Sequence, residues 1–297
     1  MEFLRTPDAR FENLPDYDFE PRYIDQPNGG RMHTIDTGGD GETLVMLHGE
    51  PSWGYLYRHI IHNLPSSYRC LAPDLMGFGR SDKPSKIEDH NYDFHYDSLS
   101  HFLTTLDLHD ITLLVQDWGG LLGLPLAVEH EARIKRLVIM NTGLGTGDID
   151  LGEGFKQWQN FAREKGLGIV AGLIVQGGTS SKLSRDVVNA YDAPFPDETY
   201  RAGVAALPLI VPSTPDMRGA KRSRDARERF KTWRKPTLVM FSDGDPVTRG
   251  GDRFFRKLIP AAKEQQEVTI VGGGHFLQED KGTEIAAQIQ AFIERTS

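Results

Sequence analysis

ITLLVQDWGG, residues 111–120, is the stretch of sequence that decides the fold. Its apolar run, residues 111–115, predicts a short buried strand of a parallel sheet. The strand ends at a polar residue, and two glycines and a largely apolar segment of helical length follow, residues 121–128. A strand that turns sharply into a helix, with a polar apex and small residues behind it, is typical of a nucleophile elbow. The usual apex is serine, whereas here it is Asp117.

Composition and charge limit the class of protein. The chain has 297 residues, 38% hydrophobic and 26% charged, which suits a globular protein with a large core. The formal net charge is −8, so we expect no nucleic-acid partner. No apolar run is long enough for a membrane span, so we expect no membrane partner. The acidic N-terminus argues against a signal peptide. We therefore expect a cytoplasmic protein.

The chain contains a single cysteine, Cys70, within a strand-like segment. A lone cysteine cannot form an internal disulfide, and we expect a buried, inert thiol. No Cys/His spacing matches a zinc site. The sequence predicts no metal and no organic cofactor.

Strand-like runs alternate with helical segments along most of the chain. Because the strands are nearly continuous apolar runs, they predict a mostly parallel sheet covered by helices on both faces. The predicted strands are residues 31–37, 43–47, 68–73, 111–115, 136–141, 236–241 and 267–271, and the predicted helices between them include residues 56–64, 97–106 and 121–128.

One region breaks this alternation. Residues 144–217 contain helical patterns and no strand–helix–strand unit, so we interpret them as a helical cap inserted into the core. Residues 1–143 and 218–297 then form the two parts of the core. The insertion follows the C-terminal end of a strand, where ligands bind in open parallel sheets. The cap would therefore lie over the elbow as a lid.

Three polar residues follow predicted strands in the order nucleophile, acid, histidine: Asp117, Asp245 and His275. This is the chain order of an α/β-hydrolase triad. Taken singly, each has an ordinary alternative, namely a helix cap, a turn before Pro246 and a loop histidine. Asp243 competes for the acid role. We favour Asp245, which lies further along the loop and directly before the proline, to orient the histidine.

An aspartate at the apex changes the expected reaction. A carboxylate needs no deprotonation at neutral pH and can displace a leaving group from a saturated carbon, which forms an alkyl ester. Water activated by His275 can hydrolyse that ester, whereas a serine would form a stable ether. Two backbone N–H groups, of Trp118 and of Glu50 after His48-Gly49, are candidates for the oxyanion hole. The sequence thus predicts cleavage of a C–halogen or epoxide C–O bond.

The tryptophans favour a halide over an epoxide. A departing halide needs donors that do not transfer a proton in a dry pocket, and indole is such a group. Trp118 adjoins the nucleophile and Trp158 lies in the predicted cap, although it could equally be a packing residue. An epoxide hydrolase would instead use acidic hydroxyls, for which the cap tyrosines Tyr191 and Tyr200 are candidates.

The chain resembles the haloalkane dehalogenases of the α/β-hydrolase superfamily, specifically the subfamily with an aspartate acid and two tryptophans. The resemblance implies that Asp117 is the nucleophile, His275 the base and Asp245 the acid. It also implies that Trp118 and Trp158 bind the halide. The matching stretches are HGEPSW at 48–53, DLMGFGRSDKP at 74–84, VQDWGG at 115–120, APFPD at 193–197 and GHFLQED at 274–280.

The resemblance implies further site residues and a reaction. Glu50 stands where related subfamilies have a halide-binding asparagine, and its carboxylate would position the hydrolytic water. The reaction would convert an apolar haloalkane and water into an alcohol, a halide ion and a proton. The positions that match the family's apolar pocket are Leu121, Phe155, Leu207, Pro208, Val211, Val247 and Phe276.

Three other functions remain open at this point. An epoxide hydrolase would share the ester chemistry. A fluoroacetate-type dehalogenase would need arginines that clamp a carboxylate, and the sequence does not place them. The fold could also serve as a non-catalytic binding module, against which the complete set of Asp, Asp and His argues. A monomer is the expected oligomeric state, with a homodimer as the alternative.

Overall fold

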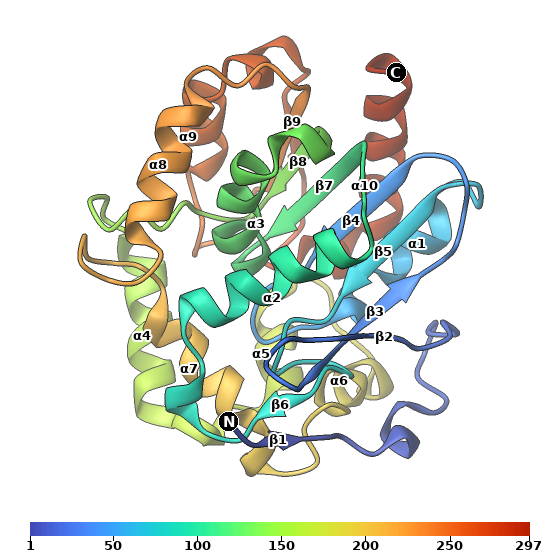
Figure 1. Cartoon of the computed structure of the whole chain (residues 1–297), viewed down its shortest axis with the longest axis vertical. Helices are drawn as coiled ribbons and strands as arrows, with labels where there is room; N and C mark the ends of the chain where they lie inside the picture. The colour runs from blue at the N-terminus through green and yellow to red at the C-terminus, as the bar shows by residue number, and fades with distance from the viewer.

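The computed structural model describes residues 1–297 and contains ten strands and ten α-helices (Figure 1). The strands are β1 (Phe3–Leu4), β2 (Arg22–Asp25), β3 (Arg31–Asp36), β4 (Thr43–Leu47), β5 (Arg69–Pro73), β6 (Lys83–Pro84), β7 (Ile111–Gln116), β8 (Ile134–Met140), β9 (Thr237–Ser242) and β10 (Val268–Ile270). The helices are α1 (Arg58–Asn63), α2 (Tyr92–Thr105), α3 (Trp118–Glu129), α4 (Gly152–Lys165), α5 (Ala171–Gly178), α6 (Arg185–Asp192), α7 (Ala202–Ile210), α8 (Ala220–Phe230), α9 (Gly251–Leu258) and α10 (Leu277–Arg295).

Eight strands form the central sheet in the order β10-β9-β8-β7-β4-β5-β3-β2. Neighbours from β10 to β5 are parallel, and β3 and β2 complete the sheet in antiparallel pairing. The chain passes from β4 to β5 on one side and returns to β7 on the other, so the order reverses at β4. Crevices at such reversal points are where open α/β sheets bind ligands. The predicted mostly parallel α/β-hydrolase sheet is confirmed.

Alternate residues of each strand face opposite layers of the core. In β4, Leu44 and Met46 pack with α1 and α10, whereas Val45 and Leu47 pack with α2 and α3. Since successive strand side chains point to opposite faces, a strand buried on both sides must be apolar throughout. This is why the inner strands were visible as continuous apolar runs.

Two local features differ from the sequence-based expectation. The first strand predicted from the sequence is residues 31–37, yet the preceding residues contain β1 and the edge strand β2, which pairs with β3. Helix α2 begins at Tyr92, five residues before its predicted start, because the Asn91 side chain accepts a hydrogen bond from the Phe94 N–H at 3.1 Å and caps the helix.

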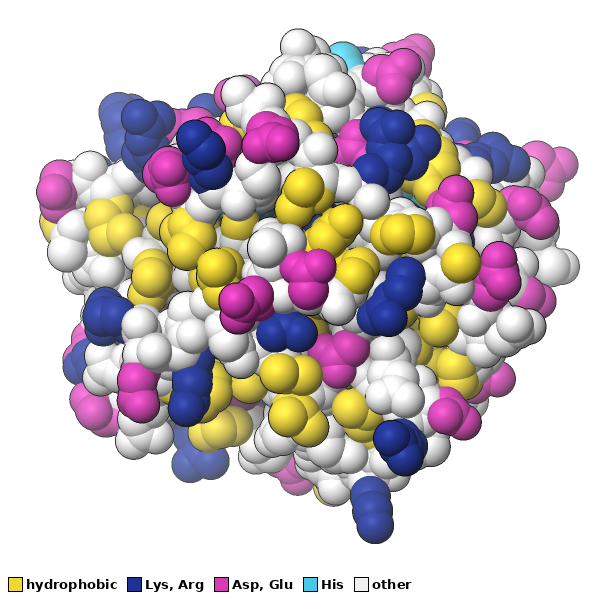
Figure 2. Space-filling view, turned by 90° about the horizontal axis from the view of Figure 1, so that it is seen from below, with side chains coloured by type: hydrophobic (Ala, Val, Ile, Leu, Met, Phe, Trp, Pro, Cys, Tyr) yellow, Lys and Arg dark blue, Asp and Glu magenta, His cyan; other side chains and the backbone are white.

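Between β8 and β9 the chain forms helices and no strand. Helices α4, α5, α6 and α7 gather in the lower part of the view in Figure 1. Seen from below, the surface carries hydrophobic side chains interspersed with charged ones of both signs (Figure 2). No helix combines the length and the apolar character that crossing a bilayer requires. Cys70 is buried without a disulfide, as predicted, and burial raises the pKa of its thiol to about 12.

Candidate active site

Asp117 occupies a sharp turn between β7 and α3. Its backbone has φ +50° and ψ −122°, a conformation that residues with side chains rarely adopt and that typically costs about 1–3 kcal/mol. The turn also requires close approach of the neighbouring backbone. A Cβ atom on Gly119 would lie 2.0 Å from the Leu47 carbonyl oxygen, and one on Gly49 would lie 2.3 Å from the Asp117 side chain. Glycine is therefore needed at both positions.

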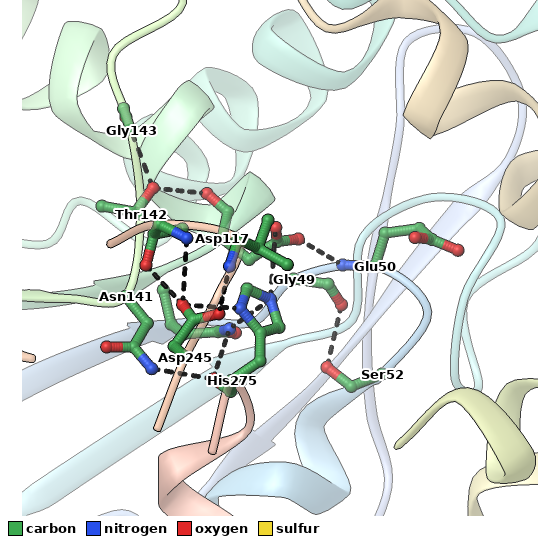
Figure 3. A network of polar contacts seen from close by, with 12 residues as sticks. Gly49, Glu50, Ser52, Asp117, Asn141, Thr142, Gly143, Asp245 and His275 are labelled. Carbon is green, nitrogen blue, oxygen red and sulfur yellow. Dashed lines mark hydrogen bonds and ion pairs between the residues drawn. The ribbon is translucent and has the colours of Figure 1, made fainter. Parts of the chain in front are cut away.

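The Asp117 carboxylate faces the ends of β4 and β10 rather than its own helix. It makes no capping hydrogen bond to α3. Its Oδ1 accepts a hydrogen bond from the Glu50 backbone N–H at 2.8 Å, and its Oδ2 lies 3.5 Å from the Nε2 atom of His275 (Figure 3). The Asp117 side chain therefore does not act as an ordinary helix cap.

His275 lies between two carboxylates. Its Nδ1 is 3.0 Å from Oδ2 of Asp245, whereas Asp243 accepts the backbone N–H of Gly272 at 2.8 Å. The structure thus brings Asp245, and not Asp243, to the histidine. Burial alone would lower the pKa of His275, but Asp245 and Asp117 raise it to about 10. Burial opposes ionisation of Asp245, yet the facing imidazole and the Thr248 hydroxyl bring its pKa to about 2.

Two buried amides hold the loop that carries the histidine. Asn141, at the end of β8, donates from Nδ2 to the carbonyl oxygens of Gly274 at 3.0 Å and His275 at 3.1 Å. Gln116, at the end of β7, donates from Nε2 to the His275 carbonyl oxygen at 3.3 Å. Sequence reasoning did not assign a role to either amide. The signal was present, because each is a polar residue that directly ends an apolar strand.

Glu50 presents a buried side chain to the same site. Its Oε1 atom has no hydrogen-bond partner, and the residue is 4% exposed. Burial, followed by the charge of Asp117, raises the pKa of this carboxyl group well above its usual range. A carboxyl group that holds its proton has a hydroxyl donor as well as an acceptor. Glu50 therefore contributes both a backbone donor and a polar side chain to the edge of the site.

The four tryptophans divide into two pairs. The indole N–H of Trp53 donates to the Ala190 carbonyl oxygen at 3.1 Å, and Trp233 is buried against Phe230. Trp118 and Trp158 instead line the cavity beside Asp117. No protein acceptor receives a hydrogen bond from either of these two indoles. Both indoles therefore line the cavity with their N–H groups unpaired within the protein.

A cavity of about 630 Å³ opens over Asp117 and His275 and is lined mainly by apolar side chains of the core edge and of α4, α5 and α9. On α4, Phe155 and Trp158 face the cavity, whereas Lys156 is exposed and pairs with Asp150 and Glu153. Six of the seven predicted pocket residues line the cavity: Leu121, Phe155, Pro208, Val211, Val247 and Phe276.

The prediction for Leu207 was wrong. This side chain is fully buried in the hydrophobic core and does not line the cavity. Pro208, the next residue of α7 and also predicted, does line it. Adjacent residues of a helix point about 100° apart, and on α7 this turns Leu207 into the core.

The groups required by the alternative functions are not in the cavity. No tyrosine lines it, and the Tyr191 hydroxyl is buried and donates to Glu279 Oε2 at 2.5 Å. Tyr200 packs half-buried against the core. Arg249 is the single arginine of the lining, whereas clamping a carboxylate in the fluoroacetate manner calls for more than one. The structure contains no cluster of three or more His, Cys, Asp or Glu side chains placed to hold a metal ion.

Comparisons with known proteins agree with this geometry. Residues 42–282 match the family model described as alpha/beta hydrolase fold. The chain is 49% identical to a haloalkane dehalogenase of Psychrobacter cryohalolentis over 99% of its own length and 98% of the relative's. It is 45% identical to haloalkane dehalogenase 1 of Mycobacterium bovis over the full length of both.

A solved structure supports the same assignment. The haloalkane dehalogenase DpaA from Paraglaciecola agarilytica NO2, described as tetrameric, superposes with a TM-score of 0.90. The two chains are 34% identical over 97% of each. This chain therefore belongs to the α/β-hydrolase fold family and, within it, to the haloalkane dehalogenases.

Proposed function

We propose that this enzyme hydrolyses haloalkanes through a covalent alkyl ester on Asp117, and that His275 then activates the water that cleaves the ester. The observation that carries the proposal is the position of a carboxylate, not a hydroxyl, at the elbow between the Glu50 N–H and the His275 imidazole. A carboxylate in that position can attack a saturated carbon without first losing a proton.

In the first step, a carboxylate oxygen of Asp117 bonds to the halogen-bearing carbon as the C–halogen bond breaks. The halide leaves with the electron pair of that bond. The indole N–H groups of Trp118 and Trp158 receive it, because they donate hydrogen bonds but cannot transfer a proton at neutral pH. The apolar cavity supports this step, since hydrogen bonds to an anion are stronger where water is excluded.

In the second step, His275 takes a proton from a water molecule, and the resulting hydroxide attacks the ester carbonyl carbon. The Glu50 and Trp118 backbone N–H groups stabilise the oxyanion. The Glu50 side chain, whose Oε1 lacks a protein partner, holds the attacking water. The carboxylate of Asp117 is regenerated, and the alcohol leaves with the halide and one proton as the other products.

The charges around His275 support its role as the base of the second step. With both carboxylates ionised, the imidazole has a pKa of about 10 and carries a proton. Alkylation converts Asp117 into a neutral ester and removes one of the two negative charges that stabilise the imidazolium. The pKa of His275 then falls, so the imidazolium releases one proton to solvent and the neutral imidazole can act as the base when the ester is ready for hydrolysis.

We also propose that residues 144–217 act as the cap of this site and that residues 1–143 and 218–297 form the core. The cap helices α4 and α5 contribute Trp158 and Phe155, and Ile174, to the cavity. The substrate class is small, apolar halogenated alkanes, because most of the cavity lining is apolar and no tyrosine is available to protonate an epoxide oxygen.

The test is to trap the ester. The variant His275→Phe keeps the nucleophile and loses the base, so one equivalent of a terminal bromoalkane should add an alkyl mass to the peptide that contains Asp117. Asp117→Ala should show neither adduct nor halide release. His109→Phe is the matched control, because His109 is exposed and remote from the cavity. Absence of an adduct in the His275 variant would falsify the covalent scheme.

A further inference from the structure

The GHFLQED stretch continues past His275 into two carboxylates, Glu279 and Asp280, that the proposed reaction does not use. Both lie in the first turn of α10 and within five residues of the histidine. Both accept hydrogen bonds from residues between α4 and α7, the region we assign to the cap. The segment that carries the base is thus tied directly to the cap.

Asp280 joins two loops. Its Oδ2 accepts the Gly274 backbone N–H at 2.8 Å and the Ser180 backbone N–H at 2.9 Å. Its Oδ1 accepts the Ser181 backbone N–H at 2.8 Å and also the Ser181 hydroxyl. Gly274 immediately precedes His275, whereas Ser180 and Ser181 follow α5. We refer to Asp280 and these three backbone N–H groups as the cap latch.

The two loops also touch directly. The Phe276 N–H donates to the Gly178 carbonyl oxygen at 3.3 Å. A Cβ atom on Gly274 would lie 2.3 Å from that same oxygen, and a Cβ on Gly178 would lie 2.7 Å from the Phe276 ring. The backbones on either side of His275 therefore pack against the end of α5 with no room for a side chain. Movement of one loop must move the other.

Glu279 holds a second point of the same junction. It accepts a bidentate pair of hydrogen bonds from the Arg58 guanidinium, each of 2.7 Å, and a third from the Tyr191 hydroxyl of α6 at 2.5 Å. Arg58 and Glu279 are 1% and 4% exposed. Removing one partner of such a buried ion pair strongly destabilises a fold. We therefore expect this junction to be rigid. Asp280, which is less buried, is the part that can be altered without disrupting the core.

We propose that Asp280 is a positioning residue, which couples closure of the cap to the placement of the His275 imidazole for ester hydrolysis. This inference rests on the proposed role of His275 as the base. Asp280 touches neither substrate nor reacting atoms. It acts through the Gly274 peptide and through the cap loop 178–181. Alkylation requires only Asp117 and the halide donors, so the cap latch should matter for the second step and much less for the first.

Asp280→Asn tests this, because the amide keeps the size of the side chain but replaces one acceptor oxygen with a donor that faces backbone N–H groups. With a terminal bromoalkane in single-turnover, rapid-quench experiments, we expect hydrolysis of the ester to slow by about tenfold, since small misplacements of a catalytic group have effects of this size or larger. Alkylation should change by less than about threefold, so that ester accumulates. Amide exchange should increase in residues 178–182 and 272–276.

Two further variants make the result decisive. Ser181→Ala removes only the hydroxyl contact. It should slow ester hydrolysis relative to alkylation, as Asp280→Asn does, but by a smaller factor. If Asp280→Asn does not fold, the result for Ser181→Ala decides the test. Glu284→Gln, an exposed position of α10 without a side-chain partner, is the matched control and should leave both rates unchanged.

The proposal is overturned if Asp280→Asn hydrolyses the ester at the wild-type rate. It is also overturned if both steps slow equally together with a lower melting temperature, because that outcome indicates a purely structural role. Failure of the underlying scheme is distinguishable, since in that case His275→Phe would form no ester on Asp117.

Discussion

The two sides of the cavity are built differently, although each supplies one indole. On the core side, every residue of α3 from Trp118 to Ala127 is buried, and Trp118 itself is 2% exposed. On the side of the proposed cap, α4 has only one buried residue, Ala162, and Trp158 is half-buried and stacked on the exposed ring of Phe161. A helix with so few buried residues opens locally at low free-energy cost.

From this difference we expect the core side to carry out the reaction and the other side to control access to the cavity. The core side holds Asp117, His275 and Asp245, the proposed nucleophile, base and acid, at strand ends that packing fixes from both faces of the sheet. The cap side presents Leu173, Ile149 and Phe161, which line the cavity and are also exposed. We therefore expect substitutions on the core side to abolish the reaction and those on the cap side to modulate its rate and substrate range. Each prediction below tests that contrast.

The largest effect is expected for Asp117→Ala. Without the carboxylate there is no nucleophile, and halide release should fall by about 10⁴-fold or more, as for other removed catalytic nucleophiles. The melting temperature should change little, because alanine keeps a Cβ atom at this strained position and the lost carboxylate is proposed to serve the reaction rather than the packing. Ion-selective measurement of bromide release, with calorimetry on the same samples, checks both statements. Release above one hundredth of the wild-type rate would contradict the assigned role.

A smaller but still large effect is expected for Asp245→Asn. Removal of this charge destabilises the imidazolium, so the pKa of His275 should fall from about 10, and ester hydrolysis should slow by about a hundredfold or more because the ring loses its orienting acceptor. Rapid-quench measurement of ester decay and an NMR titration of the His275 ring test these expectations. An unchanged His275 pKa would show that Asp245 is not its partner.

Asp245→Asn should also change how the free energy of unfolding depends on pH. In the wild type, His275 has a folded-state pKa of about 10, above its ordinary value of 6.5. The ion pair therefore stabilises the fold fully below pH 6.5, and this contribution is lost as the pH rises toward 10. Asp245→Asn should flatten the decline of the free energy of unfolding across this window. Urea titrations at several pH values measure it, with Asp243→Asn as the control.

The two indoles allow a direct comparison of the cavity's two sides. Trp118→Phe should weaken bromide binding and slow C–halogen cleavage by about 10- to 100-fold, the usual range for a lost hydrogen bond to a charged group. Trp158→Phe should have a smaller effect, because its more mobile helix orders the donor less well. Stopped-flow halide release and fluorescence quenching by bromide report on both. Trp233→Phe, outside the cavity, is the control, and a larger effect at Trp158 than at Trp118 would reverse the contrast.

The smallest effect is expected for Tyr191→Phe. The hydroxyl donates to the buried Glu279 carboxylate and does not reach the cavity, so its loss should lower the free energy of unfolding by about 1.5–3 kcal/mol. Halide release should stay within about threefold of the wild type. Chemical denaturation and steady-state kinetics are the measurements. A more than tenfold loss of activity without loss of stability would instead favour a phenol in the chemistry.

The sequence predicted the centre of the fold better than its edges. Strand β4 was predicted with its observed bounds, 43–47, because burial on both faces leaves an unbroken apolar run. Edge strand β2 has only one buried residue, Ile24, and gives no such signal. The inclusion of Leu207 among the pocket residues has a similar origin, since hydrophobicity does not specify which face of an apolar helix meets a cavity.

The order of Asp117, Asp245 and His275 could be predicted because each lies within four residues of the end of a predicted strand. The cap latch could not be predicted. Asp280 binds backbone N–H groups about 100 residues away, and a backbone donor does not depend on which side chain the residue carries. The same holds for Asn141, whose amide reaches the carbonyl oxygens beside the histidine across more than 130 residues. Contacts of this kind depend on tertiary structure alone.

The most direct test of the central claim is a single turnover in heavy-oxygen water with enzyme in excess over a terminal bromoalkane. If Asp117 forms the ester, solvent oxygen enters its carboxylate during hydrolysis, and the first alcohol released carries the unlabelled oxygen of the protein. The account predicts label in the Asp117 peptide and none in the alcohol. Labelled alcohol from the first turnover, with an unlabelled protein, would mean that water attacks the substrate directly and would contradict it.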